Sequence, residues 1–166
     1  MKKRIAFGLV FVVAAVLLVS CASSGVKIYS AIGPKSEKIA ITYNTGAQSV
    51  TDTGYWYSGY DKDVHPYVYS ESINLSNVEN REKIKAAFSA RGYRIVQESE
   101  ADCIAIVENK SDSSYSRVSV AVYDKASDTL LYVCEGEYST LLLNAQGALD
   151  KALEEALGQI IPYTGH

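Results

Sequence analysis

Histidine is scarce in this chain, and its scarcity limits the catalytic chemistry that the sequence can support. The 166 residues include only two histidines, His65 and the C-terminal His166. No serine lies in a Gly-x-Ser-x-Gly motif, which argues against a Ser-His-Asp hydrolase. A glycine-rich phosphate loop, a Cys-x-x-Cys pair and an EF-hand pattern are also missing from the sequence. We therefore expect a protein that is not an enzyme and that uses no cofactor.

Positively charged residues are fewer than negatively charged ones. The chain has 16 Lys and Arg against 19 Asp and Glu, and three of the 16, Lys2, Lys3 and Arg4, open the sequence. Removal of that start would leave 13 cationic residues against the same 19 anionic ones. Binding of nucleic acid depends on neutralising phosphates with Lys and Arg, and no basic stripe is visible. We expect no nucleic-acid partner, and the remaining length suits one domain with its own core.

The N-terminal segment has the layout of a secretory signal. Its cationic start precedes an uncharged, mostly apolar stretch that is shorter than the roughly 20 residues of a membrane-spanning helix. The stretch ends in Leu18, Val19, Ser20 and Cys21. These four residues resemble the lipobox of bacterial lipoproteins, in which the cysteine thiol receives a diacylglyceryl group, the signal is cut before it and the new amine is acylated. The alternative is an ordinary secretory signal in which Cys21 is incidental.

The lipobox resemblance implies a lipid anchor and a cellular location. An acylated Cys21 would hold the chain on a membrane, because two or more acyl chains make detachment slow at about 0.8 kcal/mol per buried methylene. Ala22, in place of an aspartate, resembles the Gram-negative sorting pattern for the outer membrane, with the domain facing the periplasm. We expect a signal peptide over residues 1–20, a lipidated, flexible tether over 21–37, a domain over 38–162 and a tail over 163–166.

Apolar periodicity predicts the secondary structure of that domain. Residues 38–43 alternate as in a strand with one buried face, and residues 103–107 are continuously apolar, which predicts burial on both faces. A capping-box pattern, Ser76 to Glu79, opens a helix that Gly92 ends. Four further segments are predicted, namely a strand over 93–96, two strands of a meander over 118–123 and 130–138, and an apolar-striped helix over 149–161 that Pro162 stops.

Together these segments predict an α+β fold with a single, mostly antiparallel sheet of about four to six strands packed against two helices. The order of a helix ending in ARGYRIV, an AD step into an apolar strand, a VAVYD hairpin and a closing apolar helix resembles envelope lipoprotein domains of unknown function. It is more remotely similar to the curli-pore lipoprotein domain and to the amino-terminal domain of the Tol translocation protein. The resemblance covers roughly residues 77–161. It implies a sheet backed by helices and a role in envelope assembly or scaffolding, with no catalytic residues.

The segment from Thr45 to Ser72 is rich in tyrosine and in turn residues. The spacing predicts two short strands joined by a loop, with each of two tyrosine pairs on one face. One interpretation is that the rings cover the edge of a small core; the other is that they form a contact surface for an envelope protein partner. A periplasmic module that binds glycan or peptidoglycan fragments would use the same aromatic residues, Tyr55, Trp56, Tyr57, Tyr60, Tyr67 and Tyr69.

Two weaker features concern metal and redox chemistry. In an extended strand, Asp61, Asp63 and His65 would point to the same side and could hold a divalent cation, although the same residues are ordinary in a polar loop. Cys103 and Cys134 lie in strand-like segments of a chain that we expect to be exported. They are either buried free thiols, on strands separated by a third, or a disulfide.

Overall fold

The computed structural model describes residues 32–45, 48–57, 64–140 and 144–165, with the backbone alone at 48, 50–57, 64–69 and 71. The predicted signal, the lipobox residues Leu18 to Cys21 and most of the predicted tether lie outside this part of the chain. Within it, neither α-helix has the length and apolar character needed to cross a membrane.

Five strands form the main sheet, in the order β4-β1-β5-β6-β7. β5, β6 and β7 form the predicted antiparallel meander, while β1 pairs in parallel with both β4 and β5. The sheet is therefore mixed, and the predicted α+β class is confirmed. The strands are β1 (Lys38–Tyr43), β4 (Arg94–Ile95), β5 (Cys103–Ser111), β6 (Tyr115–Asp124) and β7 (Thr129–Ser139), with a short 3-10 helix η1 (Glu98–Glu100) before β5.

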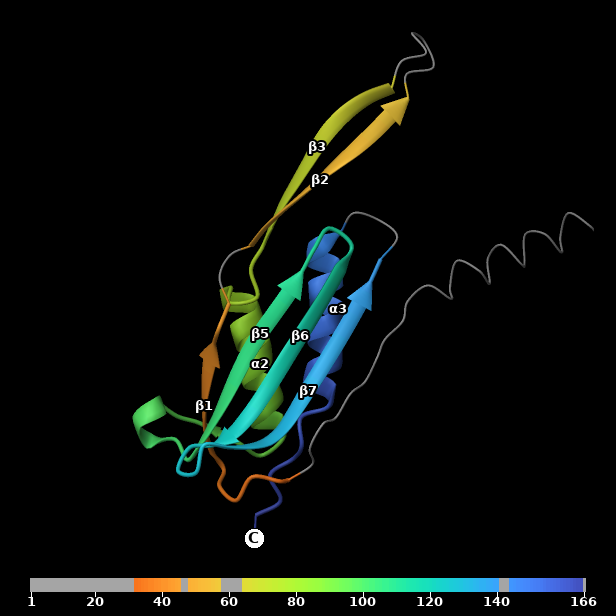
Figure 1. The fold of residues 1–166 in the computed structure, drawn as a ribbon. Coiled ribbons are helices and arrows are strands. Elements are labelled where there is room, and N and C mark those ends of the chain that lie inside the picture. Colours follow the sequence, from red (N-terminus) through yellow and green to blue (C-terminus); the bar gives the residue numbers. More distant parts are fainter. Residues whose placement is uncertain (1–31, 46–47, 58–63, 141–143, 166) are drawn as a thin grey trace, which may run out of the picture.

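Two helices, α2 (Val78–Ala90) and α3 (Ala145–Gly158), pack on the same face of this sheet (Figure 1). α2 carries the chain back toward the start of β1, because parallel strands such as β1 and β4 need a crossover connection. The core lies between the helices and the sheet and is built from buried aliphatic and aromatic side chains, among them Ile84 and Phe88 of α2 and Leu149 and Leu153 of α3. The predicted stripe of α3 thus faces the sheet, although the helix itself ends at Gly158 rather than near Pro162.

The start of α2 differs from the predicted capping box. Asn77, one residue later than expected, is the N-cap, and its side-chain oxygen accepts from the backbone N–H of Asn80 at 2.8 Å. The Ser76 hydroxyl instead donates to the side chain of Asn74 at 2.8 Å. Asparagine caps a helix at least as well as serine, so the adjacent residue takes the role when the chain enters the helix one position later.

β5 is buried on one face only, contrary to the prediction for residues 103–107. Cys103, Ala105 and Val107 are buried beneath the helices, whereas Ile104 and Ile106 are only partly buried on the opposite face. β5 also continues beyond the predicted range, to Ser111, and β6 begins earlier than predicted, at Tyr115. An uninterrupted apolar run therefore marks a strand whose second face is apolar without being covered by a described helix.

The outer edge of β7 is covered by polar side chains at the end of α3. The Gln159 side chain accepts from the Glu135 N–H at 3.4 Å and donates to the Glu135 carbonyl at 2.6 Å. The Glu155 carboxylate accepts from the Glu137 N–H at 3.3 Å. Nearer the start of β7, the N–H of Ile32 donates to the Leu131 carbonyl at 3.2 Å. These contacts occupy backbone groups that an open sheet edge would offer to another chain.

The tyrosine-rich segment forms a sheet of its own. β2 (Gln48–Tyr57) and β3 (Val64–Ile73) pair antiparallel over ten residues, which confirms two strands and makes them longer than expected. This β2–β3 hairpin extends beyond the end of the main sheet (Figure 1). Its base is held by Ile73, which is fully buried in the core together with Leu75 just after it.

Candidate functional site

The register of the β2–β3 hairpin places the two tyrosine pairs on opposite faces. Directly paired positions of an antiparallel ladder share a face, and positions two apart along a strand do so as well. Tyr55 and Tyr57 are paired with Pro66 and Val64 and therefore occupy one face of the ladder. Each pair keeps to one face, as the sequence predicts.

The other face of the hairpin holds the remaining paired aromatic positions. Tyr67 and Tyr69 pair with Gly54 and Asp52, and these positions alternate onto the face that also holds Trp56. Aromatic positions therefore occupy both faces of the hairpin toward its loop.

Most of the candidate metal trio lies outside the described residues. Asp61 and Asp63 lie outside them, as does Tyr60, while His65 lies in β3 opposite Trp56. Within the described ranges, no group of three or more His, Cys, Asp and Glu side chains is placed to hold a metal ion.

The face of the main sheet opposite the helices carries a polar cluster that the sequence does not reveal. Three positions in β5, β6 and β7 pair in one row across the strands, with Lys110 opposite Arg117 and Arg117 opposite Glu137. A second row pairs Glu108 with Ser119 and Ser119 with Glu135. The sequence alone does not reveal the cluster, because its members come from three strands and alternate with buried residues. It becomes visible only when the registers of the β5–β6 and β6–β7 pairs are known.

Glu135 is the central residue of this cluster. It is only 5% exposed, and its Oε1 accepts a hydrogen bond from Nη2 of Arg117. Arg117 also approaches Oε1 of Glu137 through its Nε, at 3.4 Å, and so spans two carboxylates of β7. The paired Glu135 carboxylate raises the pKa of the Arg117 guanidinium, chiefly through this hydrogen bond. The second oxygen of Glu135, Oε2, is buried without a hydrogen-bond partner among the described residues.

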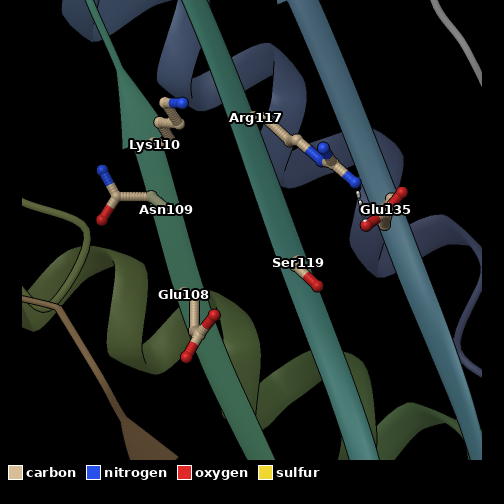
Figure 2. A pocket seen from close by; sticks show the side chains of 6 residues that line it. All are labelled: Glu108, Asn109, Lys110, Arg117, Ser119 and Glu135. Atoms are coloured by element: carbon tan, nitrogen blue, oxygen red, sulfur yellow. Dashed lines mark hydrogen bonds and ion pairs between the residues drawn. The ribbon is translucent and has the colours of Figure 1, made fainter.

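These side chains surround an open hollow of about 250 Å³. Figure 2 shows Arg117 extending from β6 toward Glu135 on β7, with Ser119 farther along the same strand. Glu108 is fixed at the opposite rim, since its Oε1 accepts from the side-chain amide of Asn44 at 2.6 Å. The full lining is Glu108, Asn109, Lys110, Arg117, Ser119 and Glu135. We refer to it as the polar hollow.

The two cysteines of the domain are in the core beneath the opposite face. Cys103 and Cys134 are free and buried, on strands separated by β6. Burial raises the pKa of both thiols, that of Cys134 to about 12. Burial also raises the pKa of Tyr132, whose hydroxyl lies 3.4 Å from that of Tyr93. These groups are structural rather than reactive, because the thiolate is the reactive form of cysteine.

Alkylation tests this description of the thiols. At about pH 8, iodoacetamide should leave Cys103 and Cys134 unmodified in the folded chain and should modify both in guanidinium, since folding keeps them protonated and inaccessible. Mass spectrometry of tryptic peptides would measure the modified fraction of each. Rapid modification of Cys134 without denaturant would contradict its burial.

The described part of the chain belongs to the α+β class, with a five-stranded mixed sheet packed against two helices. No protein-family model matches the chain, and no curated protein matches it. Among solved structures, the chain is similar to a PelC dodecamer from Paraburkholderia phytofirmans, with 11% sequence identity and a TM-score of 0.46. The similarity covers 87% of this chain and 99% of the PelC chain. At this identity and TM-score, the similarity concerns only the path of the backbone.

Proposed function

We propose that this protein is a lipid-anchored component of a bacterial envelope, that it has no catalytic activity, and that it binds an envelope protein partner through the β2–β3 hairpin. The anchor is Cys21, in the outer membrane, with the domain facing the periplasm. The sequence Leu18 to Cys21 supports the anchor. The separate two-stranded sheet is the observation that carries the role in binding.

An isolated two-stranded hairpin has low stability in water, which supports contact with a partner. Two strands alone are at best marginally stable in water. The hairpin pairs with no strand of the main sheet among the described residues. Its aromatic positions, on both faces, are residue types that interfaces favour, because tyrosine and tryptophan combine apolar area with a polar group. A partner that packs on the hairpin would stabilise it further.

The described N-terminal residues and the β2–β3 hairpin lie at opposite ends of the main sheet, which supports a hairpin directed away from the membrane. Ile32, the first described residue, is bonded to Leu131 near the start of β7, whereas the hairpin extends beyond the other end of the sheet (Figure 1). Ten residues lie between Cys21 and Ile32, so the eleven Cα–Cα steps of this connection can span at most about 40 Å. An anchored domain would therefore stay close to the membrane while its hairpin reaches into the periplasm.

The lipid anchor is tested by intact mass. The chain extracted from membranes should begin at Cys21 and carry acyl mass, and a Cys21→Ala variant should carry none, because the thiol is the attachment point. An unlipidated wild-type chain would overturn the anchor and leave the hairpin proposal to stand on its own test.

The hairpin contact is tested by replacing its aromatic residues. Trp56→Ala and Tyr57→Ala should lower the yield of a photo-crosslinked envelope complex by about tenfold or more, since central interface aromatics commonly contribute 2 kcal/mol or more. The crosslinker would be placed at position 55, and Val78→Ala, at a side chain of α2 that is exposed, is the control. Circular dichroism should show all variants folded. If both aromatic variants unfold, the rings belong to a core and the binding surface is wrong.

A further inference from the structure

We propose that the polar hollow, on the face of the main sheet opposite α2 and α3, binds a neutral polyhydroxylated ligand, a saccharide unit, with Glu135 accepting from one of its hydroxyls. This site lies on β5, β6 and β7 and is distinct from the β2–β3 hairpin. It therefore goes beyond the proposed function and does not depend on it.

The first argument is the second carboxylate oxygen of Glu135. The residue is 5% exposed, and within the described part of the chain only Oε1 is bonded, to Arg117. A buried carboxylate oxygen without a donor carries a desolvation cost that native structures rarely leave uncompensated. Glu135 lines the hollow, so a ligand group that enters it can supply the missing donor.

The second argument is the mixture of donors and acceptors around the hollow. Lys110 and Arg117 only donate, Glu108 and Glu135 only accept when ionised, and the hydroxyl of Ser119 does both. A ligand with a single charge would meet a like charge on one wall. A hydroxylated neutral ligand meets no such repulsion, because each hydroxyl can donate to a carboxylate and accept from a cation.

The third argument is a second cation beside Arg117, which already pairs with Glu135 and Glu137. Lys110 and Arg117 lie directly opposite each other in the β5–β6 ladder. Like charges at paired positions of an antiparallel ladder are unfavourable. Sequences depart from such local preferences mainly at functional sites, so this pair is consistent with two donors kept at the rim of a binding site.

The size of the hollow and its surroundings favour a chain of sugar units over a compact ligand. Its volume of about 250 Å³ is below the ~300–1,000 Å³ of sites that enclose drug-sized ligands. A second, more apolar hollow of about 310 Å³ lies on the same sheet and is lined by Ile104, Ile106, Tyr123 and Asp128. Glu108 and Ile104 are four residues apart in β5, about 13 Å along the strand. A short oligosaccharide can therefore place one unit in the polar hollow and the apolar face of another against Tyr123.

Calorimetric titration of the full chain in detergent tests the site. The probes are tetra-N-acetylchitotetraose and maltotetraose as neutral oligosaccharides, with inorganic phosphate as a small anion and n-butylamine as a small cation. Saturable binding of at least one oligosaccharide is expected, weakened by about tenfold or more in Glu135→Gln, because the amide cannot replace a charge-assisted acceptor. Ser119→Ala should weaken the same binding to a smaller degree.

Two control variants distinguish binding in the polar hollow from binding elsewhere on the chain. Glu154→Gln removes an exposed carboxylate of α3, on the helix side of the sheet, and should leave the affinity unchanged. Trp56→Ala with Tyr57→Ala tests the hairpin as the alternative saccharide site: a loss of affinity in this variant would move saccharide binding to the hairpin and overturn this site. The proposal is likewise overturned if neither oligosaccharide binds at millimolar concentration, if Glu135→Gln binds as well as wild type, or if only a charged probe binds.

Discussion

Replacing Gly136 with alanine should lower the free energy of unfolding by about 3 kcal/mol, at the upper end of the usual cost of overpacking. Gly136 lies in β7 directly beneath the backbone of α3. A Cβ atom at this position would overlap the carbonyl oxygen of Ala152 and would lie 2.7 Å from the backbone nitrogen of Ala156. Neither atom belongs to a side chain that can rotate away, so α3 would have to lift from the sheet. Urea unfolding followed by circular dichroism measures the change.

Gly158→Ala is the matched control for this prediction. Gly158 is the last residue of α3, and a Cβ there would have no described neighbour within 4 Å. Alanine favours a helix over glycine by up to about 1 kcal/mol, so this variant should be unchanged or slightly more stable. Equal stability of Gly136→Ala and the wild type would show that α3 does not rest on Gly136.

The contact at Gly136 shows which part of the packing the sequence predicts. The apolar stripe of α3 follows from its spacing, and the structure places that stripe on the sheet. The alanines at 152 and 156 are part of it and allow the helix backbone to approach closely. The partner of that approach is a glycine in another element, and sequence periodicity does not relate residues of different elements. The helix is therefore predictable from the sequence, but its close packing against Gly136 of β7 is not.

The same distinction holds for the sheet. The meander of β5, β6 and β7 is predictable because consecutive strands with short turns pair antiparallel. The parallel pairing of β1 with both β4 and β5 depends on a crossover of more than forty residues, which local patterns do not specify. The prediction of two buried faces for β5 is wrong, because an apolar composition alone does not show which face the helices cover.

The two candidate sites differ in the same way. The hairpin is evident from a local run of aromatic residues, and its strands and register now place those positions on both faces. The polar hollow is assembled from single residues of three strands whose neighbours are buried. Its charges look like an ordinary solvated face until the register brings Glu135 and Arg117 together. Function carried by one segment is thus easier to detect than function carried by the face of a sheet.

Replacing Arg117 with methionine should lower the free energy of unfolding by about 2 kcal/mol, whereas Glu135→Gln should lower it by less than about 1 kcal/mol. Removal of the arginine leaves a buried carboxylate without its cation, and such a loss commonly costs about 3–5 kcal/mol. The smaller value expected here reflects the Arg117 side chain, which is 38% exposed, so that water can reach part of the pair. Chemical unfolding of both variants gives the two values.

The asymmetry between the two variants is the feature that identifies Glu135 as a buried charge. In Glu135→Gln, Arg117 keeps its contact with Glu137 and its access to water, so little is lost. The double variant Arg117→Met with Glu135→Met should recover most of the stability lost in Arg117→Met, because no charge is then left unpaired. Arg94→Met is the control, since Arg94 faces Glu37 at 3.4 Å with both side chains largely exposed, and an exposed pair contributes about 0–1 kcal/mol. Equal losses in Arg117→Met and Glu135→Gln would mean that Glu135 is solvated, and its second oxygen would then give no reason for a ligand in the polar hollow.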